Sequence, residues 1–376
     1  MRSGSAPFIA VNEPLLDGNE KKYLASCIDT GWISSEGPFV QQFEKALAER
    51  VKRKHGVAVC NGTAALDAAI EALGIGPGDE VILPAFTIIS CIGQIIRCGA
   101  RPVLVDSDAR TWNMDVAQIE ARITPRTKAI MVVHLYGLPA DLDPLLELAR
   151  RHGLHVLEDA AEMHGQTYRG RPCGSFGDLS TFSFYPNKLV TTGEGGMIVT
   201  NDDQLAAACV SLRNLCFQPE RRFVHERLGW NLRMTNLQAA LGVAQLERLD
   251  EFALRKRAMG RRYSELLGDI DGLQLPLART DYAENIYWVY GLVLDDARGL
   301  DSAEAVRRLA ALGVGCRPFF CPMHQQPVLK SRGLFAGESY PVAERLYRRG
   351  FYIPSGLALT EAQMVRVAEA VHEVLK

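Results

Sequence analysis

Short apolar runs rich in β-branched residues alternate with stretches of helical period through the first two thirds of the chain. The apolar runs predict strands at 55–60, 80–88, 101–106, 128–137, 154–162, 178–188 and 195–201. Helices are predicted between them, as at 63–73, where Leu66 and Ile70 share one face, and at 143–153. The run 128–137 is apolar throughout, as expected for a strand covered on both faces. Strands alternating with helices predict an α/β fold with a mostly parallel sheet.

The pattern changes after about residue 245. A long amphipathic helix is predicted over 246–267, short strands follow at 287–294 and 314–320, and a last helix ends the chain. A chain of 376 residues is also long enough for two domains. We therefore predict a large α/β domain over residues 1–245 and a smaller α+β domain over residues 246–376.

The composition excludes several classes of function. Hydrophobic residues make up 47%, charged residues 23%, and the formal net charge is -2, so no overall field attracts nucleic acid or an anionic membrane. No apolar run approaches the length that spans a bilayer, and the first residues lack a secretory signal pattern. The nine cysteines are scattered without a CxxC pair, which favours reduced thiols. We expect a cytoplasmic protein without nucleic-acid, membrane or metal partners.

Polar residues stand where predicted strands end, which is the edge at which open α/β sheets bind ligands. The first group is Asn61-Gly62-Thr63, at the start of the helix 63–73. Gly62 permits a close approach of backbone, and a helix N-terminus offers N–H groups to an anion. The alternative is an ordinary N-cap turn, which is the commoner reason for Asn at such a position.

Two further positions carry charged groups at strand ends. Glu158 and Asp159 close an apolar run, and a carboxylate buried there needs a partner, either a protonated ring nitrogen or a neighbouring Arg or Lys. Lys188 ends the predicted strand 178–188 and precedes a glycine-rich turn. A lysine in a partly dry pocket becomes an amine nucleophile, whereas the alternative is a surface lysine with a buried stem.

The three groups together match the anchors that pyridoxal 5'-phosphate needs. Its phosphate needs backbone donors, its pyridine nitrogen a carboxylate, and its aldehyde an amine. The order along the chain, with the Asn61-Gly62-Thr63 turn first, then the aspartate and then the lysine, therefore favours a pyridoxal phosphate enzyme over three unrelated structural explanations.

Longer blocks of the sequence resemble the sugar-nucleotide aminotransferases, a branch of the fold-type-I, aspartate aminotransferase-like enzymes. These blocks are GWISSEGPFVQQFEKALAE, NGTAALDAAIEALGIGPGDEVILPAFT, EDAAEMHG, FYPNKLVTTGEGGM and GWNLRMTNLQAALG. The resemblance covers almost the whole chain. It implies a fold-type-I pyridoxal phosphate-dependent transferase with a mostly parallel sheet and a smaller C-terminal domain.

The resemblance also implies roles for individual residues. Lys188 forms the Schiff base with the cofactor, and Asp159 keeps the pyridinium nitrogen protonated. Gly62, Thr63 and Ser183 hold the phosphate with backbone and hydroxyl donors. L-Glutamate displaces Lys188, whose freed amine moves a proton from the donor's Cα to C4′ of the cofactor. A keto sugar then receives the amino group.

Three other implied positions have open alternatives. An Asn in the GWN block of this family reaches the phosphate of the neighbouring subunit's cofactor, which implies that Asn231 completes a site shared within a homodimer. Glu162 stands where many members have Gln, near the cofactor's O3′. Many members stack an aromatic residue on the cofactor at the position of Ile88. Packing by Ile88 and stacking by Phe86 are both open as substitutes, and simple core packing is the alternative for both residues.

The blocks NIYWVYGLVL, RRFVHERLGWNLRMTN and GCRPFFCPMHQQPVL resemble the GDP-perosamine synthases more than the UDP- or dTDP-sugar branches. This implies amination of GDP-4-keto-6-deoxy-D-mannose at C4. His324 would then lie near the sugar nucleotide, with Arg233 and Phe319 as weaker candidates. Core packing is the alternative for Phe319, and a structural contact with a carboxylate is the alternative for Arg233.

Three other functions are alternatives to amination of a GDP-linked sugar. Relatives that remove a hydroxyl group carry His at the lysine position, so Lys188 argues against that reaction. A UDP- or dTDP-linked keto sugar stays open as the substrate. A regulatory protein that binds pyridoxal phosphate without turnover would need a DNA-binding element, and no helix-turn-helix extension or basic arm is visible.

Overall fold

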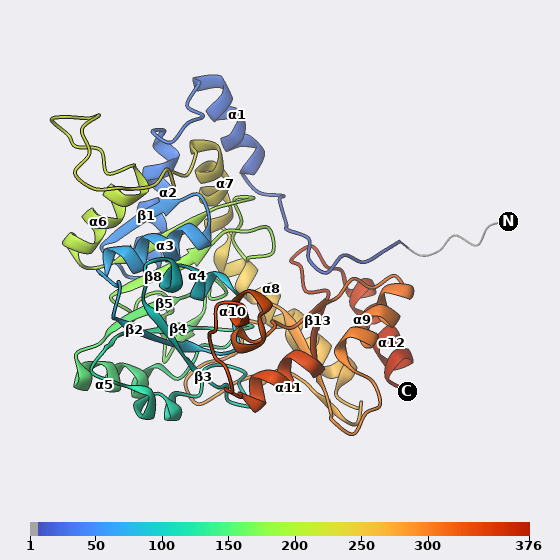
Figure 1. Ribbon diagram of the computed structural model, residues 1–376. Coiled ribbons are helices and arrows are strands. Elements are labelled where there is room, and N and C mark those ends of the chain that lie inside the picture. Colours follow the sequence, from blue (N-terminus) through green and yellow to red (C-terminus); the bar gives the residue numbers. More distant parts are fainter. Residues whose placement is uncertain (1–6) are drawn as a thin grey trace.

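A computed structural model describes residues 7–376. Its larger part is built on a seven-stranded sheet in the order β1-β9-β8-β5-β4-β2-β3 (Figure 1). The strands are β1 (His55–Val59), β2 (Glu80–Pro84), β3 (Arg101–Val105), β4 (Thr127–Val133), β5 (His155–Asp159), β8 (Leu179–Ser183) and β9 (Gly196–Thr200). Only β9 runs against its neighbours β1 and β8. The predicted α/β fold with a mostly parallel sheet is confirmed.

Helices cover both faces of this sheet because the buried strands are apolar on both sides. On β4, Met131 packs with one helical layer, and Ile130 and Val132 pack with the other. The helices of the larger part are α1 (Glu20–Thr30), α2 (Pro38–Arg50), α3 (Gly62–Ala72), α4 (Ser90–Arg97), α5 (Leu142–His152), α6 (Asp203–Arg213) and α7 (Asn236–Leu246). Gly153 ends α5 with a left-handed φ of 64°, a backbone conformation that glycine adopts without steric cost.

The smaller part holds an antiparallel sheet in the order β10-β11-β13-β12. Its elements are α8 (Leu249–Leu267), β10 (Leu273–Gln274), β11 (Tyr290–Leu294), α9 (Ser302–Ala311), β12 (Arg317–Pro318), α10 (Pro327–Lys330), α11 (Pro341–Arg349), β13 (Gly350–Ile353) and α12 (Glu361–Leu375). The short pieces β6 (Thr167–Tyr168), β7 (Arg171–Pro172), η1 (Val116–Gln118), η2 (Glu120–Arg122) and η3 (Met323–Gln325) complete the elements. The division at residue 245 stays a prediction.

The first described residues lie against the smaller part. Ile9 forms a parallel bridge with Val314, and the backbone N–H of Ser355 donates to the carbonyl of Val11 at 3.0 Å. Ile9 is 3% exposed and belongs to the same apolar core as β11 and α12. The N-terminal segment therefore packs with residues from the far end of the chain.

Several predicted strands are longer than the observed ones. The strand predicted at 178–188 ends at Ser183, so Lys188 lies in the turn that follows β8 rather than at its last position. The apolar run extends past the strand because Phe184 and Leu189 are buried although they lie outside β8. The strand predicted from Tyr287 begins at Tyr290, since Tyr287 has a φ of 50°, which extended backbone excludes.

Within residues 7–376, the helices are too short or too polar for any of them to cross a membrane. The parallel strands β1, β4, β5 and β8 all end at the same edge of the sheet. This edge is where the polar groups picked out from the sequence gather.

Candidate active site

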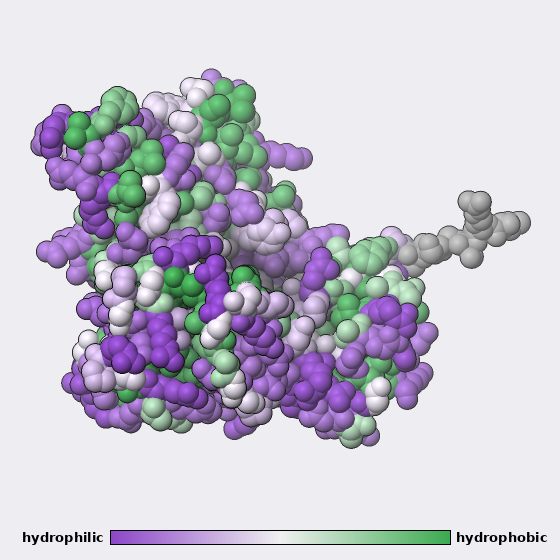
Figure 2. Space-filling view, viewed as in Figure 1, coloured by the Kyte–Doolittle hydropathy of each residue, from purple (hydrophilic) through white to green (hydrophobic). Residues whose placement is uncertain are grey.

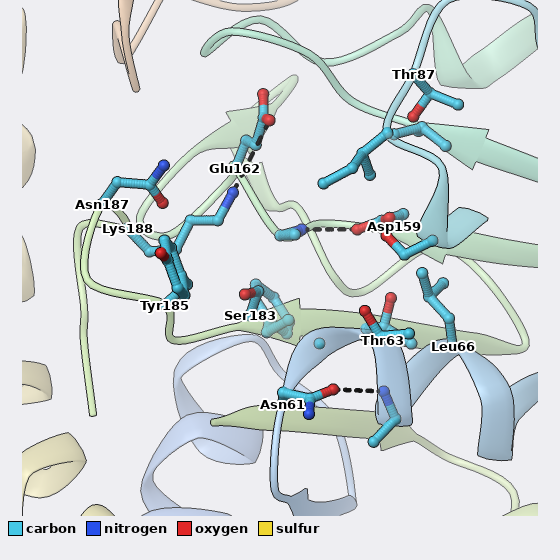
Figure 3. A pocket seen from close by; sticks show the side chains of 18 of the residues that line it. Asn61, Thr63, Leu66, Thr87, Asp159, Glu162, Ser183, Tyr185, Asn187 and Lys188 are labelled. Atoms are coloured by element: carbon cyan, nitrogen blue, oxygen red, sulfur yellow. Dashed lines mark hydrogen bonds and ion pairs between the residues drawn. The ribbon is translucent and has the colours of Figure 1, made fainter. Parts of the chain in front are cut away.

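A cavity of about 760 Å³ opens at the carboxyl edge of the large sheet. Figure 3 shows the side chains of the strand-end residues turned toward a common space. The sequence-predicted residues that line this cavity are Gly62, Thr63, Ile88, Asp159, Glu162, Ser183 and Lys188. The ones that do not line it are Phe86, Asn231, Arg233, Phe319 and His324.

The N-terminus of α3 forms one wall of the cavity. The Asn61 side chain accepts a hydrogen bond from the N–H of Ala64 at 2.8 Å, so the N-cap turn is present (Figure 3). A Cβ added at Gly62 would lie 2.7 Å from the Cβ of Ser183, so a residue without a side chain is needed for this close packing. First-turn N–H groups have no acceptor inside a helix, and they stand beside the Thr63 and Ser183 hydroxyls. The wall is therefore suited to an anion such as phosphate.

Asp159 is the last residue of β5 and is 4% exposed. One of its oxygens accepts the N–H of Ala161 at 3.0 Å, and the other accepts the thiol of Cys91 at 3.3 Å. Burial raises the pKa of Asp159, and the backbone and thiol hydrogen bonds only partly oppose this. Among residues 7–376 no lysine or arginine bonds to this carboxyl. A cationic ring nitrogen in the cavity would supply the missing charge partner.

Lys188 lies in the turn after β8, where its N–H donates to the carbonyl of Tyr185 at 2.9 Å. Its side chain is 11% exposed, and its Nζ lies 3.9 Å from an oxygen of Glu162 (Figure 3). The same Nζ lies 3.9 Å from the centre of the Trp288 ring. Burial lowers the pKa of Lys188, while the charge of Glu162 opposes this shift. A lowered pKa makes the neutral, nucleophilic amine accessible near neutral pH.

Glu162 shares this buried space with Lys188. One of its oxygens accepts the N–H of Tyr136 at 2.6 Å, and its side chain is 7% exposed. Burial raises the pKa of Glu162 to about 8, against the opposing charge of Lys188. A carboxyl with such a pKa can donate or accept a proton near neutral pH, whereas a glutamine amide at this position could not titrate.

The two alternatives for stacking on a ligand lie in different surroundings. Ile88 is 46% exposed and lines the cavity. Phe86 is fully buried, with its ring 6.0 Å from those of Tyr136, Phe319 and Phe320. Phe319 belongs to the same aromatic core, 4.5 Å from Tyr136. The structure thus puts Ile88 at the cavity wall and both phenylalanines in the core.

The remaining three predicted residues lie outside the cavity. Nε2 of His324 contacts a carboxylate oxygen of Glu344 at 2.9 Å. Nη1 of Arg233 donates to the side chain of Asn214 at 2.7 Å. Asn231 is exposed and pairs with Asn214 through an isolated bridge. Within one subunit these residues have structural contacts and do not face Lys188.

Sequence reasoning missed the contribution of the smaller part to the cavity. Trp288, Phe320 and Tyr352 line it from that side, next to Lys188. Trp288 and Phe320 fall inside blocks that the sequence singled out for another reason, and Tyr352 falls in none. Only the folded arrangement brings them to the strand ends, because no local pattern encodes contacts across such distances along the chain.

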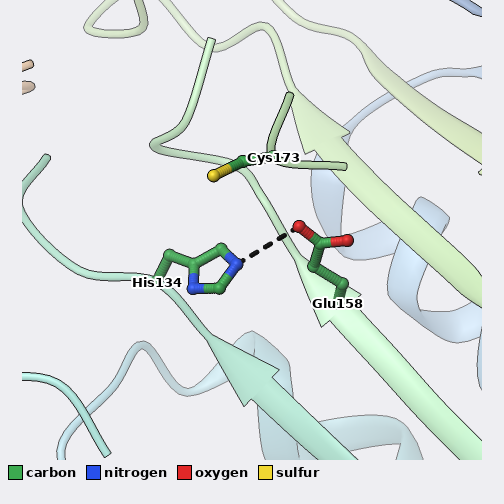
Figure 4. A group of neighbouring side chains, drawn as sticks. All are labelled: His134, Glu158 and Cys173. Atoms are coloured by element: carbon green, nitrogen blue, oxygen red, sulfur yellow. Dashed lines mark hydrogen bonds and ion pairs between the residues drawn. The ribbon is translucent and has the colours of Figure 1, made fainter. Parts of the chain in front are cut away.

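Glu158, next to Asp159 in sequence, points to the opposite side of β5 and has a structural role. Figure 4 shows it beside His134 and Cys173, a buried group with the spacing of metal ligands. Nδ1 of His134 accepts the N–H of Ala140 at 3.1 Å, so its Nε2 donates to Glu158 at 3.2 Å. Although burial opposes it, the bonds from His134 and from backbone N–H groups such as that of Phe176 lower the pKa of Glu158 to about 2. These bonds already satisfy the carboxylate without a metal ion.

An amine nucleophile and a buried carboxylate in one cavity serve group transfer through a bound carrier. Fold and site together define an aminotransferase of the α/β type. The chain belongs to the DegT/DnrJ/EryC1/StrS aminotransferase family, whose family model matches residues 14–372.

Relatives and solved structures agree with this membership. The chain is 48% identical to GDP-perosamine synthase from Caulobacter vibrioides, over 98% of this chain and 99% of the relative. It is 41% identical to GDP-perosamine synthase from Escherichia coli O157:H7, over 97% of this chain and 98% of the relative. The crystal structure of the aminotransferase TlmJ from Streptoalloteichus hindustanus matches with a TM-score of 0.90 and 31% identity, over 98% of both chains. The predicted family, enzyme class and fold are confirmed.

Proposed function

We propose that this chain transfers the amino group of L-glutamate to C4 of GDP-4-keto-6-deoxy-D-mannose and so makes GDP-perosamine, with pyridoxal 5'-phosphate as the cofactor. The observation that carries the proposal is a cavity holding one buried lysine in a chain 48% identical, over nearly its full length, to a GDP-perosamine synthase. The proposal has four parts: the cofactor, the proton transfer, the substrate and the assembly.

The cavity fits the proposed cofactor. Gly62 leaves no room for a side chain beside Ser183, and this close packing exposes the N-terminus of α3 to a phosphate. Asp159 is a buried carboxyl without a cationic partner among the described residues, which suits a protonated pyridine nitrogen. The hydroxyl of Thr181 also lines the cavity and is buried without a hydrogen-bond partner in residues 7–376. Lys188 supplies the amine that an aldehyde requires.

When bound, pyridoxal phosphate withdraws electrons from the carbon that loses a proton. This chain's residues then have separate tasks. The Lys188 amine takes the proton from Cα of glutamate, and burial lowers its pKa, which favours the neutral form that accepts a proton. Asp159 holds the proton on the ring nitrogen. Glu162 lies 3.9 Å from the Lys188 Nζ. At this distance its carboxylate stabilises the amine each time the amine is protonated.

The choice of a guanine nucleotide rests on the two relatives and on a physical argument. A guanine base has a donor-rich edge that uracil and thymine lack, and acceptors built for that edge stay unpaired when a pyrimidine nucleotide binds. Each unpaired group costs about 1–3 kcal/mol, so kcat/KM should favour the GDP sugar by at least about tenfold.

The test is an amination assay with GDP-, UDP- and dTDP-linked 4-keto-6-deoxy sugars, glutamate as donor and Lys188→Ala as the blank. A preference for the GDP sugar supports the proposal. Equal or faster turnover of a UDP or dTDP sugar would refute the substrate and leave the aminotransferase. Absence of any glutamate-dependent reaction would refute the whole function.

A homodimer with a shared active site is part of the proposal. Exposed apolar side chains lie on α1 and on the loop between α6 and α7, where Figure 2 shows hydrophobic patches at the top of the view. Trp32 after α1 is 49% exposed, and Phe223 and Leu228 in the loop are 81% and 92% exposed. A surface of this kind needs a partner, and a second copy would bring its own Asn231 toward this cavity.

Subunit mixing tests the shared site. Asn231→Ala subunits and Lys188→Ala subunits are mixed, and each heterodimer then has one site with neither lesion. Recovered activity supports the proposal, whereas confirmed heterodimers that stay inactive contradict it. We also propose a cytoplasmic location, because all nine cysteines are unpaired in the structure, as suits a reducing compartment.

A further inference from the structure

Trp288 connects the smaller part of the chain to the turn that carries Lys188. The face of its ring lies 3.9 Å from the Lys188 Nζ. Its indole N–H donates to the backbone carbonyl of Asn187, the residue before Lys188, at 2.8 Å. One side chain therefore contacts both the amine of Lys188 and the peptide bond between Asn187 and Lys188, which sets the position of the Lys188 backbone.

Other buried residues fix the position of Trp288. Nζ of Lys256, which is 2% exposed, donates to the carbonyl of Trp288 at 2.9 Å. The Trp288 ring stacks on Tyr136 with a centroid distance of 6.2 Å and an interplanar angle of 12°. Tyr287 adopts a left-handed φ of 50°, and its ring fills the space where a side chain at Gly260 would stand. Backbone and side chain of Trp288 are thus both fixed by the core.

We propose that Trp288 is the positioning residue of Lys188: its ring face holds the freed amine, and its N–H fixes the carbonyl of Asn187. This inference rests on the proposed function, in which the Lys188 amine leaves the cofactor and then moves a proton. An amine on a flexible four-carbon stem would otherwise sample many positions, and proton transfer needs one defined position.

The ring also bears on the charge of the amine. An aromatic face attracts an ammonium group and not a neutral amine, so it favours the protonated form. Burial opposes this form, while the charges of Glu162, Asp159 and Cys91 favour it. Loss of the ring should therefore make the freed Lys188 amine lose its proton at lower pH.

Two variants separate the two contacts. Trp288→Leu removes the ring face and the N–H, whereas Trp288→Phe keeps a ring face and removes the N–H alone. The matched control is Trp112→Phe: Trp112 is also buried, its ring lies 6.3 Å from Tyr136, and within residues 7–376 its indole nitrogen has no partner. Trp112 does not line the cavity.

The holoenzymes are compared by stopped-flow in the half-reaction with glutamate from pH 6 to pH 10. For Trp288→Leu we expect a maximal rate at least about tenfold lower, a KM for glutamate changed less than about twofold, and an acidic limb moved down by about 0.4–1.5 pH units. Trp288→Phe should keep the limb and lose about twofold to tenfold in rate. Trp112→Phe should match wild type.

A second measurement does not depend on turnover. The visible band of the lysine-bound cofactor is titrated with pH in the resting enzymes. Its midpoint should change in Trp288→Leu through loss of the ring face, and in Trp288→Phe because loss of the N–H to the Asn187 carbonyl shifts the lysine nitrogen, but not in Trp112→Phe. If Trp288→Leu does not fold, the rate and the midpoint measured for Trp288→Phe test the inference instead. An unmoved or raised acidic limb in Trp288→Leu, or an unchanged midpoint in Trp288→Phe, overturns the inference while wild type stays active. A loss confined to KM also overturns it, because it indicates a substrate contact. Inactive wild type overturns the proposed function as well.

Discussion

Replacing Glu162 by Gln should change the pH dependence of stability more than any other single substitution in the cavity. The carboxyl accepts the N–H of Tyr136 at 2.6 Å, and the carbonyl oxygen of a glutamine can accept the same bond. The shapes are nearly equal, so the variant removes the titration and little else. The burial of Glu162 raises its pKa from 4.5 to about 8.

The sign follows from proton linkage. A carboxyl with a pKa raised by folding contributes its full stability below its unfolded pKa of 4.5, and this contribution is lost as the pH rises through the folded value of about 8. At about 1.4 kcal/mol per pKa unit, the whole shift corresponds to about 5 kcal/mol, which the ammonium of Lys188 partly offsets. Glu162→Gln should therefore gain about 2–5 kcal/mol over wild type between pH 5 and pH 9.

The assay is urea unfolding of cofactor-free protein at pH 5, 6, 7, 8 and 9, because Lys188 then has its free amine. The two free energies of unfolding should agree within about 1 kcal/mol at pH 5, diverge steadily as the pH rises toward 8, and keep a nearly constant difference above that, with the variant more stable. The control is Glu369→Gln on α12, whose exposed carboxyl stays hydrated in the folded and unfolded states. Parallel curves for wild type and Glu162→Gln, or a variant that loses stability as the pH rises, would refute the argument.

Three other substitutions test separate features. Lys188→Ala should abolish turnover in the amination assay, and several equivalents of product per subunit without added amine would contradict the role of Lys188. Gly62→Ala should lower cofactor affinity at least about tenfold in a dialysis titration, because its Cβ would lie 2.7 Å from Ser183 and displace the start of α3. The control is Gly299→Ala, since beyond its chain neighbours no described residue has an atom within 4 Å of the added Cβ. Equal affinities for both variants would contradict the role of Gly62 in phosphate binding. Burial lowers the pKa of His164 from 6.5 to about 3, so wild type loses stability as the pH falls below 6.5, and His164→Leu should gain about 2 kcal/mol on wild type between pH 8 and pH 5. Urea midpoints that do not converge or cross over this range would contradict this prediction.

The sequence predicted those parts of the site that are encoded locally. Asn61 to Thr63 begin a helix directly after a strand, and Asp159 ends an apolar run, so each could be placed on a strand end without knowledge of the fold. The predicted position of Lys188 was less accurate, because buried apolar residues such as Phe184 continue after Ser183 although β8 ends there. Trp288 and Tyr352 could not be placed in the cavity, since their positions at its wall depend on how the smaller part packs. The pairing of Arg233 with Asn214 and of His324 with Glu344 depends on tertiary contacts in the same way.

The pairing of Ile9 with Val314 has a consequence for how the protein is made. Ile9 leaves the ribosome early, but its partner Val314 and Ser355 emerge only near the end of synthesis. The large sheet has all its strands by Thr200 and can form while the chain is still growing, whereas the N-terminal segment must wait. The carbonyl of Pro7 accepts a bond from Arg366 at 2.5 Å, so the beginning of the described chain lies beside its last helix. A short linker between the two ends, with new termini in an exposed loop, should therefore give a circular permutant whose N-terminal segment no longer waits for its partner.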